Sequence, residues 1–131
     1  MSKKGVYLML LMCLLTGVGT SISVADSGYL FAFNPPFGGC AKELEAKNRS
    51  TSPRVSVTTV ETDYWHQNER DTISTTYCLR YNKEVVSSYV KLKRGQNGRF
   101  SYITGGTKAG LLGYPTNTQF DPYTVGGYWQ P

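Results

Sequence analysis

Apolar and polar residues alternate in short segments through most of this 131-residue chain. Tyr29, Phe31 and Phe33 form the first such series, and Val55 and Val57 begin the next. Period-two alternation puts every second side chain on one face of an extended strand, whereas an amphipathic helix repeats every three to four residues. The segments are rich in Thr, Val and Tyr and are separated by Gly, Asn and Pro, as strands joined by turns are. We therefore expect an all-β fold without a long amphipathic helix.

Residues 26–131 are enough for one domain with its own core and too few for two of ordinary size. We expect a single antiparallel β-sandwich of about six or seven strands. The first strand ends at Asn34-Pro35-Pro36, because proline lacks the backbone donor that a sheet needs. Asn82-Lys83-Glu84 predicts a tight turn, so that the strands on either side form a hairpin. The later segments expected to be strands are 54–64, 72–81, 85–93, 100–104 and 123–129.

Two stretches are expected to lack long regular elements. Residues 38–52 hold at most one helical turn and are interpreted as a loop. Residues 105–122 are interrupted so often by Gly and Pro that regular structure beyond a few residues is not expected. In the last strand, the small Gly126 and Gly127 would let another segment pack close. The core-facing residues of that strand are expected to be Tyr123, Val125 and Trp129.

The first 25 residues have the parts of a secretory signal peptide. Lys3 and Lys4 form a basic start, residues 6–18 are almost entirely apolar, and Ser23-Val24-Ala25 supplies small residues for a signal peptidase. We expect a signal-peptide helix, cleavage after Ala25, and a secreted, extracellular protein that begins at Asp26. A retained membrane anchor is the alternative, although the apolar run is short for a bilayer span.

Two cysteines remain after the leader, Cys40 and Cys78. Outside the cytoplasm, a cysteine pair without metal-type spacing favours a disulfide, which would stabilise the fold by roughly 3–4 kcal/mol in the chain-entropy model. Strict alternation puts Cys78 on the strand face opposite Tyr77 and Leu79. A loop carrying Cys40 would then have to fold over that face. Two buried, unpaired thiols are the alternative.

The formal charge of +5 falls by two when Lys3 and Lys4 leave with the leader, and the mature chain stays mildly basic. The excess gathers in Lys91, Lys93, Arg94 and Arg99. Such a cluster can sit against an anionic envelope polymer or lipid headgroups. The alternative is a solvated strand edge protected by charge. We expect no nucleic-acid partner, because the chain has no recognition motif.

Aromatic residues are the second set of candidate contacts. Exposed aromatic side chains on loops or strand ends can stack on sugars or enter a lipid interface. In the alternative interpretation most of them fill the sandwich edges, and the last tryptophan anchors its strand in the core. The candidates are Tyr64, Trp65 and Trp129, accompanied by Tyr114 and Tyr128.

Catalytic chemistry has little support in this sequence. The chain has one histidine, His66, and no serine lies in a nucleophile motif. His66, Glu69 and Asp71 are close in sequence but do not form a dense metal-ligand set, and a polar turn explains them more simply. We therefore expect no metal, no cofactor and no enzymatic activity.

Several motifs of the second half have a family likeness: Thr76-Tyr77-Cys78-Leu79, Tyr89-Val90-Lys91-Leu92, Leu111-Leu112 and the ending Tyr123-Thr124-Val125-Gly126-Gly127-Tyr128-Trp129. Residues 75–129 resemble a domain-of-unknown-function family of small exported proteins of Gram-positive bacteria. The chain departs from that family at its two mature cysteines and at Gly126, where Ser is usual. The family has no catalytic residues to carry over, and some members are associated with bacteriocin or peptide-transport genes.

Two functional classes follow from these observations. The first is a non-enzymatic binding or accessory module at the cell envelope, secreted or attached to the cell wall. Its partner would be an envelope polymer, lipid headgroups or another surface protein. The alternative is a secreted bacteriocin-like antagonist or its immunity partner. The sequence leaves the ligand and the oligomeric state open.

Overall fold

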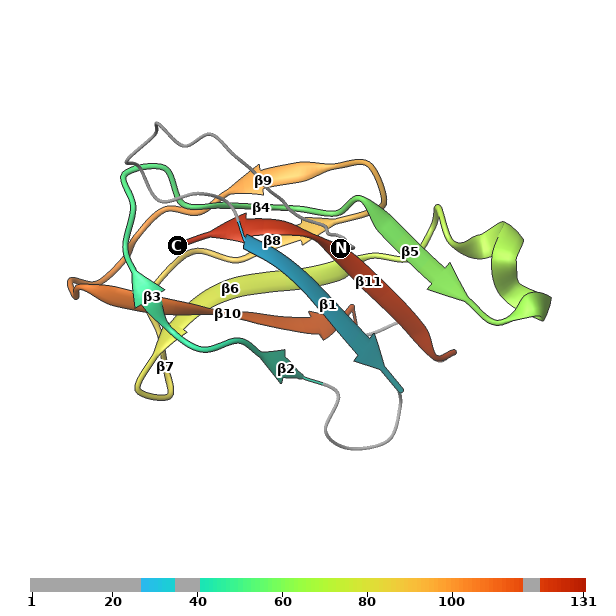
Figure 1. Cartoon of the computed structure of the whole chain (residues 1–131), viewed down its shortest axis with the longest axis horizontal. Helices are drawn as coiled ribbons and strands as arrows, with labels where there is room; N and C mark the ends of the chain where they lie inside the picture. The colour runs from blue at the N-terminus through green and yellow to red at the C-terminus, as the bar shows by residue number, and fades with distance from the viewer. Residues whose placement is uncertain (1–26, 35–40, 117–120) are drawn as a thin grey trace.

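The computed structural model describes residues 27–34, 41–116 and 121–131. Within them, eleven strands form two antiparallel sheets that pack face to face (Figure 1). The expected all-β sandwich is confirmed, with more and shorter strands than anticipated. The predicted leader and Cys40 lie outside the described residues. None of the helical structure in the described part is long and apolar enough to cross a membrane.

The first sheet is built on β11, which pairs with β1 along one side and with β4 and β5 along the other. The β1 register runs from Ser27 opposite Trp129 to Phe33 opposite Tyr123. Strand β9 pairs with β4 and completes the sheet. The five strands are β1 (Ser27–Phe33), β4 (Arg54–Ser56), β5 (Thr59–Thr62), β9 (Asn97–Arg99) and β11 (Tyr123–Gln130).

The second sheet is centred on the paired strands β6 and β10. Two short strands, β2 and β3, add to the outer side of β10, so the loop expected at 38–52 contributes to the sheet after all. A 3-10 helix, η1 (Tyr64–Glu69), connects β5 to β6. The six strands are β2 (Lys42–Glu43), β3 (Lys47–Asn48), β6 (Thr75–Tyr81), β7 (Glu84–Val85), β8 (Val90–Leu92) and β10 (Lys108–Pro115).

Strand β10 corrects the prediction that residues 105–122 are too broken for regular structure. Its glycines are sites of close packing. A Cβ atom at Gly110 would lie 2.3 Å from the backbone oxygen of Leu44, and one at Gly113 would lie 2.9 Å from the Phe31 ring. Only glycine lets a strand come this close to its neighbours.

The expected strand 54–64 is split into β4 and β5 by a bulge. The register changes from Val55 opposite Trp129 to Thr59 opposite Gly126, so three residues on one strand face two on β11. The bulge brings the Ser56 carbonyl oxygen to 2.0 Å from the position of a Cβ atom at Gly127. The prediction that the glycine pair allows close packing is thereby confirmed.

The predicted hairpin at residues 82–84 is also present. Tyr81 pairs with Glu84, and the two turn residues Asn82 and Lys83 have φ angles of 52° and 68°. Positive φ at both positions is the signature of the type I′ turn, whose twist matches that of the strands. The return strand is split into β7 and β8, and in the gap the Ser87 hydroxyl accepts a 2.8 Å hydrogen bond from the backbone N–H of Leu79.

The strand predicted at 100–104 is wrong, because the paired segment lies earlier, at β9. Tyr102 makes only an isolated bridge with Ser87. Gly98 in β9 sits opposite Val55, and a Cβ atom there would lie 3.3 Å from the side chains of Val90 and Leu92. Gly98 therefore allows tight packing between the two sheets.

The core between the sheets is aromatic and aliphatic, as the alternation predicts. Tyr29, Phe31 and Phe33 are all buried on the inner face of β1. The Tyr29 hydroxyl shares a buried 2.8 Å hydrogen bond with the Tyr77 hydroxyl of the facing sheet. Burial holds the pKa of both phenols above the ordinary range of tyrosine. The pair thus ties the two sheets together as neutral, hydrogen-bonded groups.

Candidate ligand-binding surface

Two arginines lie on neighbouring strands on the outer face of the first sheet. Arg54 of β4 lies directly opposite Arg99 of β9 in the strand register. The next pair, Val55 and Gly98, faces the core, and Val55 is fully buried. Because side chains alternate along a strand, both arginines point outward, where they are exposed.

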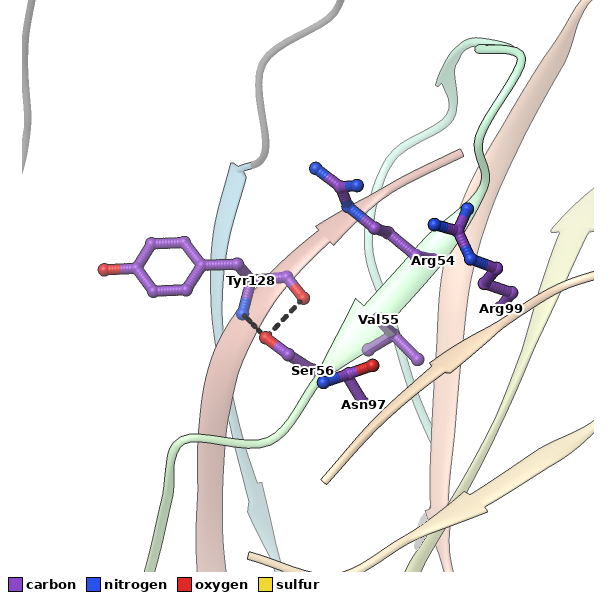
Figure 2. A pocket seen from close by; sticks show the side chains of 6 residues that line it. All are labelled: Arg54, Val55, Ser56, Asn97, Arg99 and Tyr128. Carbon is purple, nitrogen blue, oxygen red and sulfur yellow. Dashed lines mark hydrogen bonds between the residues drawn. The ribbon is translucent and has the colours of Figure 1, made fainter. Parts of the chain in front are cut away.

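An open surface pocket of about 300 Å³ surrounds this pair (Figure 2). The half-exposed Tyr128 of β11 and Asn97 of β9 contribute further polar and aromatic groups. The pocket is lined by Arg54, Val55, Ser56, Asn97, Arg99 and Tyr128. Three strands that are distant in sequence therefore build one concave patch.

The bulge described above fixes one wall of the pocket. The Ser56 hydroxyl donates to the Tyr128 carbonyl oxygen at 3.3 Å and accepts from the Tyr128 N–H at 3.2 Å (Figure 2). The Ser56 hydroxyl thus replaces the backbone hydrogen bonds that a regular pair of strands would make at the bulge. It holds β4 against β11 at that point. The position of the Tyr128 backbone is thereby set by β4.

The electrostatics of the pocket favour an anion. Like charges directly opposite each other on neighbouring strands are destabilising. Arg99 donates from Nη1 to the Ser52 hydroxyl at 2.6 Å, which orients the guanidinium and leaves its charge in place. Guanidinium groups bind carboxylate and phosphate oxygens through paired hydrogen bonds. The arrangement can therefore hold one acidic group of a larger molecule.

The basic cluster predicted from the sequence is divided by the fold. Lys91 lies on the outer face of the second sheet, opposite Thr76, whereas Arg99 lies on the first sheet. The chain crosses between the sheets in the exposed turn that contains Lys93 and Arg94. These four side chains consequently do not form a single patch.

The turn itself is partly neutralised. Arg94 Nε lies 2.6 Å from Asp71 Oδ1. This contact raises the pKa of Arg94 and lowers that of Asp71. Arg94 therefore has an acidic partner at the surface.

The aromatic candidates separate into exposed and buried residues. Tyr64 and Trp65, on η1, are 77% and 78% exposed, and their rings meet edge to face at 5.2 Å. In Figure 1 this helix projects from one end of the sandwich. Trp129 is 1% exposed, so its predicted ligand contact is corrected to a core role. Lys47 covers it, with Nζ 5.6 Å from the ring centroid.

Polar contacts hold the start of η1. Asp63 caps it by accepting from the His66 N–H at 3.0 Å, and the same carboxylate oxygen lies 2.6 Å from His66 Nδ1. His66 Nε2 is 3.5 Å from Asp121. The hydrogen bond to Asp63, aided by the charge of Asp121, raises the pKa of His66. These contacts match the interpretation of His66 as a turn residue, and nowhere in the described ranges do three His, Cys, Asp or Glu side chains converge for a metal.

Cys78 is fully buried, and its sulfur forms no disulfide with any residue that the structure describes. Desolvation raises its pKa to about 11, although nearby Arg80 acts in the opposite direction. Its predicted disulfide partner, Cys40, falls outside the described residues. The pairing therefore remains a prediction.

Of the residues singled out from the sequence, the predicted contact Arg99 and the accompanying aromatic residue Tyr128 lie in the pocket. Sequence reasoning missed Arg54, Ser56 and Asn97. Arg54 opens a strongly alternating strand, so its outward direction was readable from the sequence. Its pairing with β9 was not, because that depends on long-range register.

Comparisons with known proteins give no independent assignment. No family model, no curated protein and no solved structure matches the chain.

Proposed function

We propose that this protein is a non-enzymatic binding module that recognises an anionic polymer of the bacterial cell envelope through the arginine pocket. The observation that carries the proposal is the cross-strand pair of Arg54 and Arg99 in an open pocket beside Tyr128. The leader of the sequence, with its predicted cleavage, supports an extracellular site of action.

The pocket chemistry suggests which polymer class fits. Two guanidinium groups suit a phosphate or carboxylate, and the half-exposed Tyr128 ring offers an apolar face for an adjoining sugar or polyol. Asn97 adds donor and acceptor groups for hydroxyls. A glycan or polyol chain with acidic substituents provides all of these partners, and a single lipid headgroup provides fewer.

The test is sedimentation of the purified protein with isolated Gram-positive cell walls, before and after chemical removal of their anionic polymers. Neutralising the pocket with Arg54→Gln and Arg99→Gln should weaken binding on the order of tenfold or more, because hydrogen bonds to charged groups contribute about 1.5–3 kcal/mol. Binding should also decline with added salt.

The matched control removes the same charge elsewhere. Lys91→Gln with Lys93→Gln neutralises two exposed cations away from the pocket and should weaken binding much less. Equal losses in both double variants would mean that only net charge matters, and the pocket proposal would fail. Vesicles containing phosphatidylglycerol form a second arm, and stronger binding to them than to walls would assign the site to lipid headgroups.

The second candidate is a secreted antagonist of the bacteriocin type or its immunity partner. Tyr64 and Trp65 favour it, because two adjacent exposed aromatic rings at one end of the molecule suit insertion at a membrane interface. Purified protein should then inhibit related Gram-positive strains, and Trp65→Ala should relieve the inhibition. No growth effect at high protein concentration would count against this function.

A further inference from the structure

The edges of this sandwich are protected in different ways. In the second sheet, the edge strands β2, β3, β7 and β8 are two or three residues long, and each includes a charged residue. In the first sheet, β9 has three residues and ends with Arg99. Short length and charge are the usual means by which proteins prevent edge-to-edge pairing.

Strand β1 lacks both protections. It is seven residues long, its sequence Ser-Gly-Tyr-Leu-Phe-Ala-Phe has no charge and no proline, and its register with β11 is continuous. Among the described strands, only β11 pairs with it. A long, regular, uncharged edge is a template for another strand.

The outer face of β1 is apolar and symmetric about its centre. Leu30, the middle residue of Ser27–Phe33, is 71% exposed, with the small Gly28 and Ala32 on either side. If the strand pairs antiparallel with a copy of itself about this centre, Leu30 faces its own equivalent. Gly28 then lies opposite Ala32, and Tyr29 opposite Phe31. Every apolar residue of the outer face meets another small or apolar residue.

We infer that β1 is a self-association edge, at which two copies of this chain pair antiparallel through β1 and join their first sheets into one. In a two-fold contact only a residue on the axis meets its own equivalent, so a charge at the centre of the strand would meet a like charge. Strand β1 has no charged residue, so two copies can pair through it without repulsion between like charges. The neighbouring edge of the second sheet carries Lys42, Glu43, Glu45 and Lys47, whose charges balance.

The interface offers few side chains, so association should be weak and dependent on concentration. Sedimentation velocity across a concentration series should show a monomer–dimer equilibrium for protein purified from cells that express the full sequence. Leu30→Lys puts two like charges at the two-fold axis and should give monomer at every concentration. The substitution is at an exposed position, and a circular dichroism spectrum identical to that of the parent would show an intact fold.

The matched control is Ile103→Lys, which changes a 63% exposed aliphatic residue outside the strands and should leave the equilibrium unchanged. A parent protein that stays monomeric throughout would overturn the inference. So would a Leu30→Lys variant that still dimerises, or an Ile103→Lys variant that dissociates equally.

Register is tested by cysteine cross-linking. A thiol at Leu30→Cys would meet its equivalent across the axis and should form a covalent dimer on mild oxidation. At Ala32→Cys the two thiols would be about 14 Å apart along the strands, too far for a disulfide. The unsubstituted protein sets the background from its own cysteines. Cross-linking at both positions alike, or at neither, would contradict pairing centred on Leu30.

Discussion

At Gly127 the backbone of β4 lies so close to β11 that a Cβ atom has no room. Gly127→Ala would put a Cβ atom 2.0 Å from the Ser56 carbonyl oxygen, which belongs to the backbone and cannot rotate away. We expect the free energy of unfolding to fall by about 1–3 kcal/mol or more, since overpacking forces the strands to shift. Urea unfolding measures the change.

The control for this substitution is another strand glycine with open space. A Cβ atom at Gly28 would have its nearest neighbour at 3.9 Å. Gly28→Ala should therefore leave stability unchanged or slightly higher. Similar losses at both positions would mean that strand glycines matter here for some reason other than the bulge.

His66 provides a pH-dependent prediction. Its pKa lies above the ordinary 6.5, chiefly because of the Asp63 hydrogen bond and then because of Asp121. A group whose pKa is raised by folding stabilises the fold below its unfolded pKa, and the effect disappears as pH rises through the folded pKa. Stability should therefore decline slightly from mildly acidic to mildly basic pH, and His66→Gln should remove that decline.

NMR titration of the His66 imidazole can distinguish the effects of Asp63 and Asp121 on its pKa. Asp63→Asn keeps an oxygen that can cap η1 but removes the charge next to Nδ1, so the His66 pKa should fall clearly. Asp121→Asn should lower it less, because its contact with Nε2 is longer, at 3.5 Å. The reverse order would contradict the assignment of Asp63 as the main cause.

At the scale of elements, a substitution in the turn between β6 and β7 should make the fold more stable. Lys83 has a φ of 68°, a left-handed conformation that costs a residue with a Cβ atom about 1–2 kcal/mol. Lys83→Gly creates Asn-Gly, the preferred type I′ pair, and should raise the free energy of unfolding by about 0.5–1 kcal/mol. Urea denaturation would measure it.

Lys91→Gly in β8 serves as the control, since it makes the same change within a strand. It should lower stability by about 0.5–1 kcal/mol, because glycine loses more backbone freedom when a strand forms. If both variants change the free energy of unfolding in the same direction, the positive φ of Lys83 is not the cause of the effect in the turn.

Local pattern predicted the elements whose alternation is regular and whose neighbours are close in sequence. The strands at β1, β6 and β11 and the turn at Asn82-Lys83 belong to this group. Strand β10 does not, because its Gly110 and Gly113 are required by contacts with Leu44 and Phe31, which are more than 60 positions away. A glycine kept for close packing is indistinguishable, in one sequence, from a glycine that breaks a strand.

At the scale of the whole molecule, the candidate pocket could not be predicted because it also depends on contacts between residues far apart in sequence. Lys91 and Arg99 are eight positions apart, yet the chain crosses from one sheet to the other between them. Arg54 and Arg99 are far apart in sequence and become neighbours through the β4–β9 register. Clusters of charge in sequence are clusters in space only where the chain stays in one layer.

Export gives the molecular-scale prediction. Intact mass spectrometry of a producing culture should find a species that begins at Asp26, one residue before β1. If Cys40 and Cys78 are joined, this species lacks two hydrogen atoms relative to the reduced chain. If they are not, Cys78 should resist alkylation at pH 8 until the protein unfolds, since its pKa is raised to about 11 by burial. An uncleaved form in the membrane would instead favour the retained anchor.

The outer face of β1 is continuous with the face that carries the arginines, because Gly28 is paired with Tyr128 in the sheet register. A two-fold axis between antiparallel β1 strands runs perpendicular to the sheet, so both pockets of a dimer would open on the same side. A long polymer could then occupy both at once, and the second contact would profit from a high effective concentration. Apparent affinity would depend on chain length: short oligomers would reveal the intrinsic strength of one pocket, and long ones would reveal avidity.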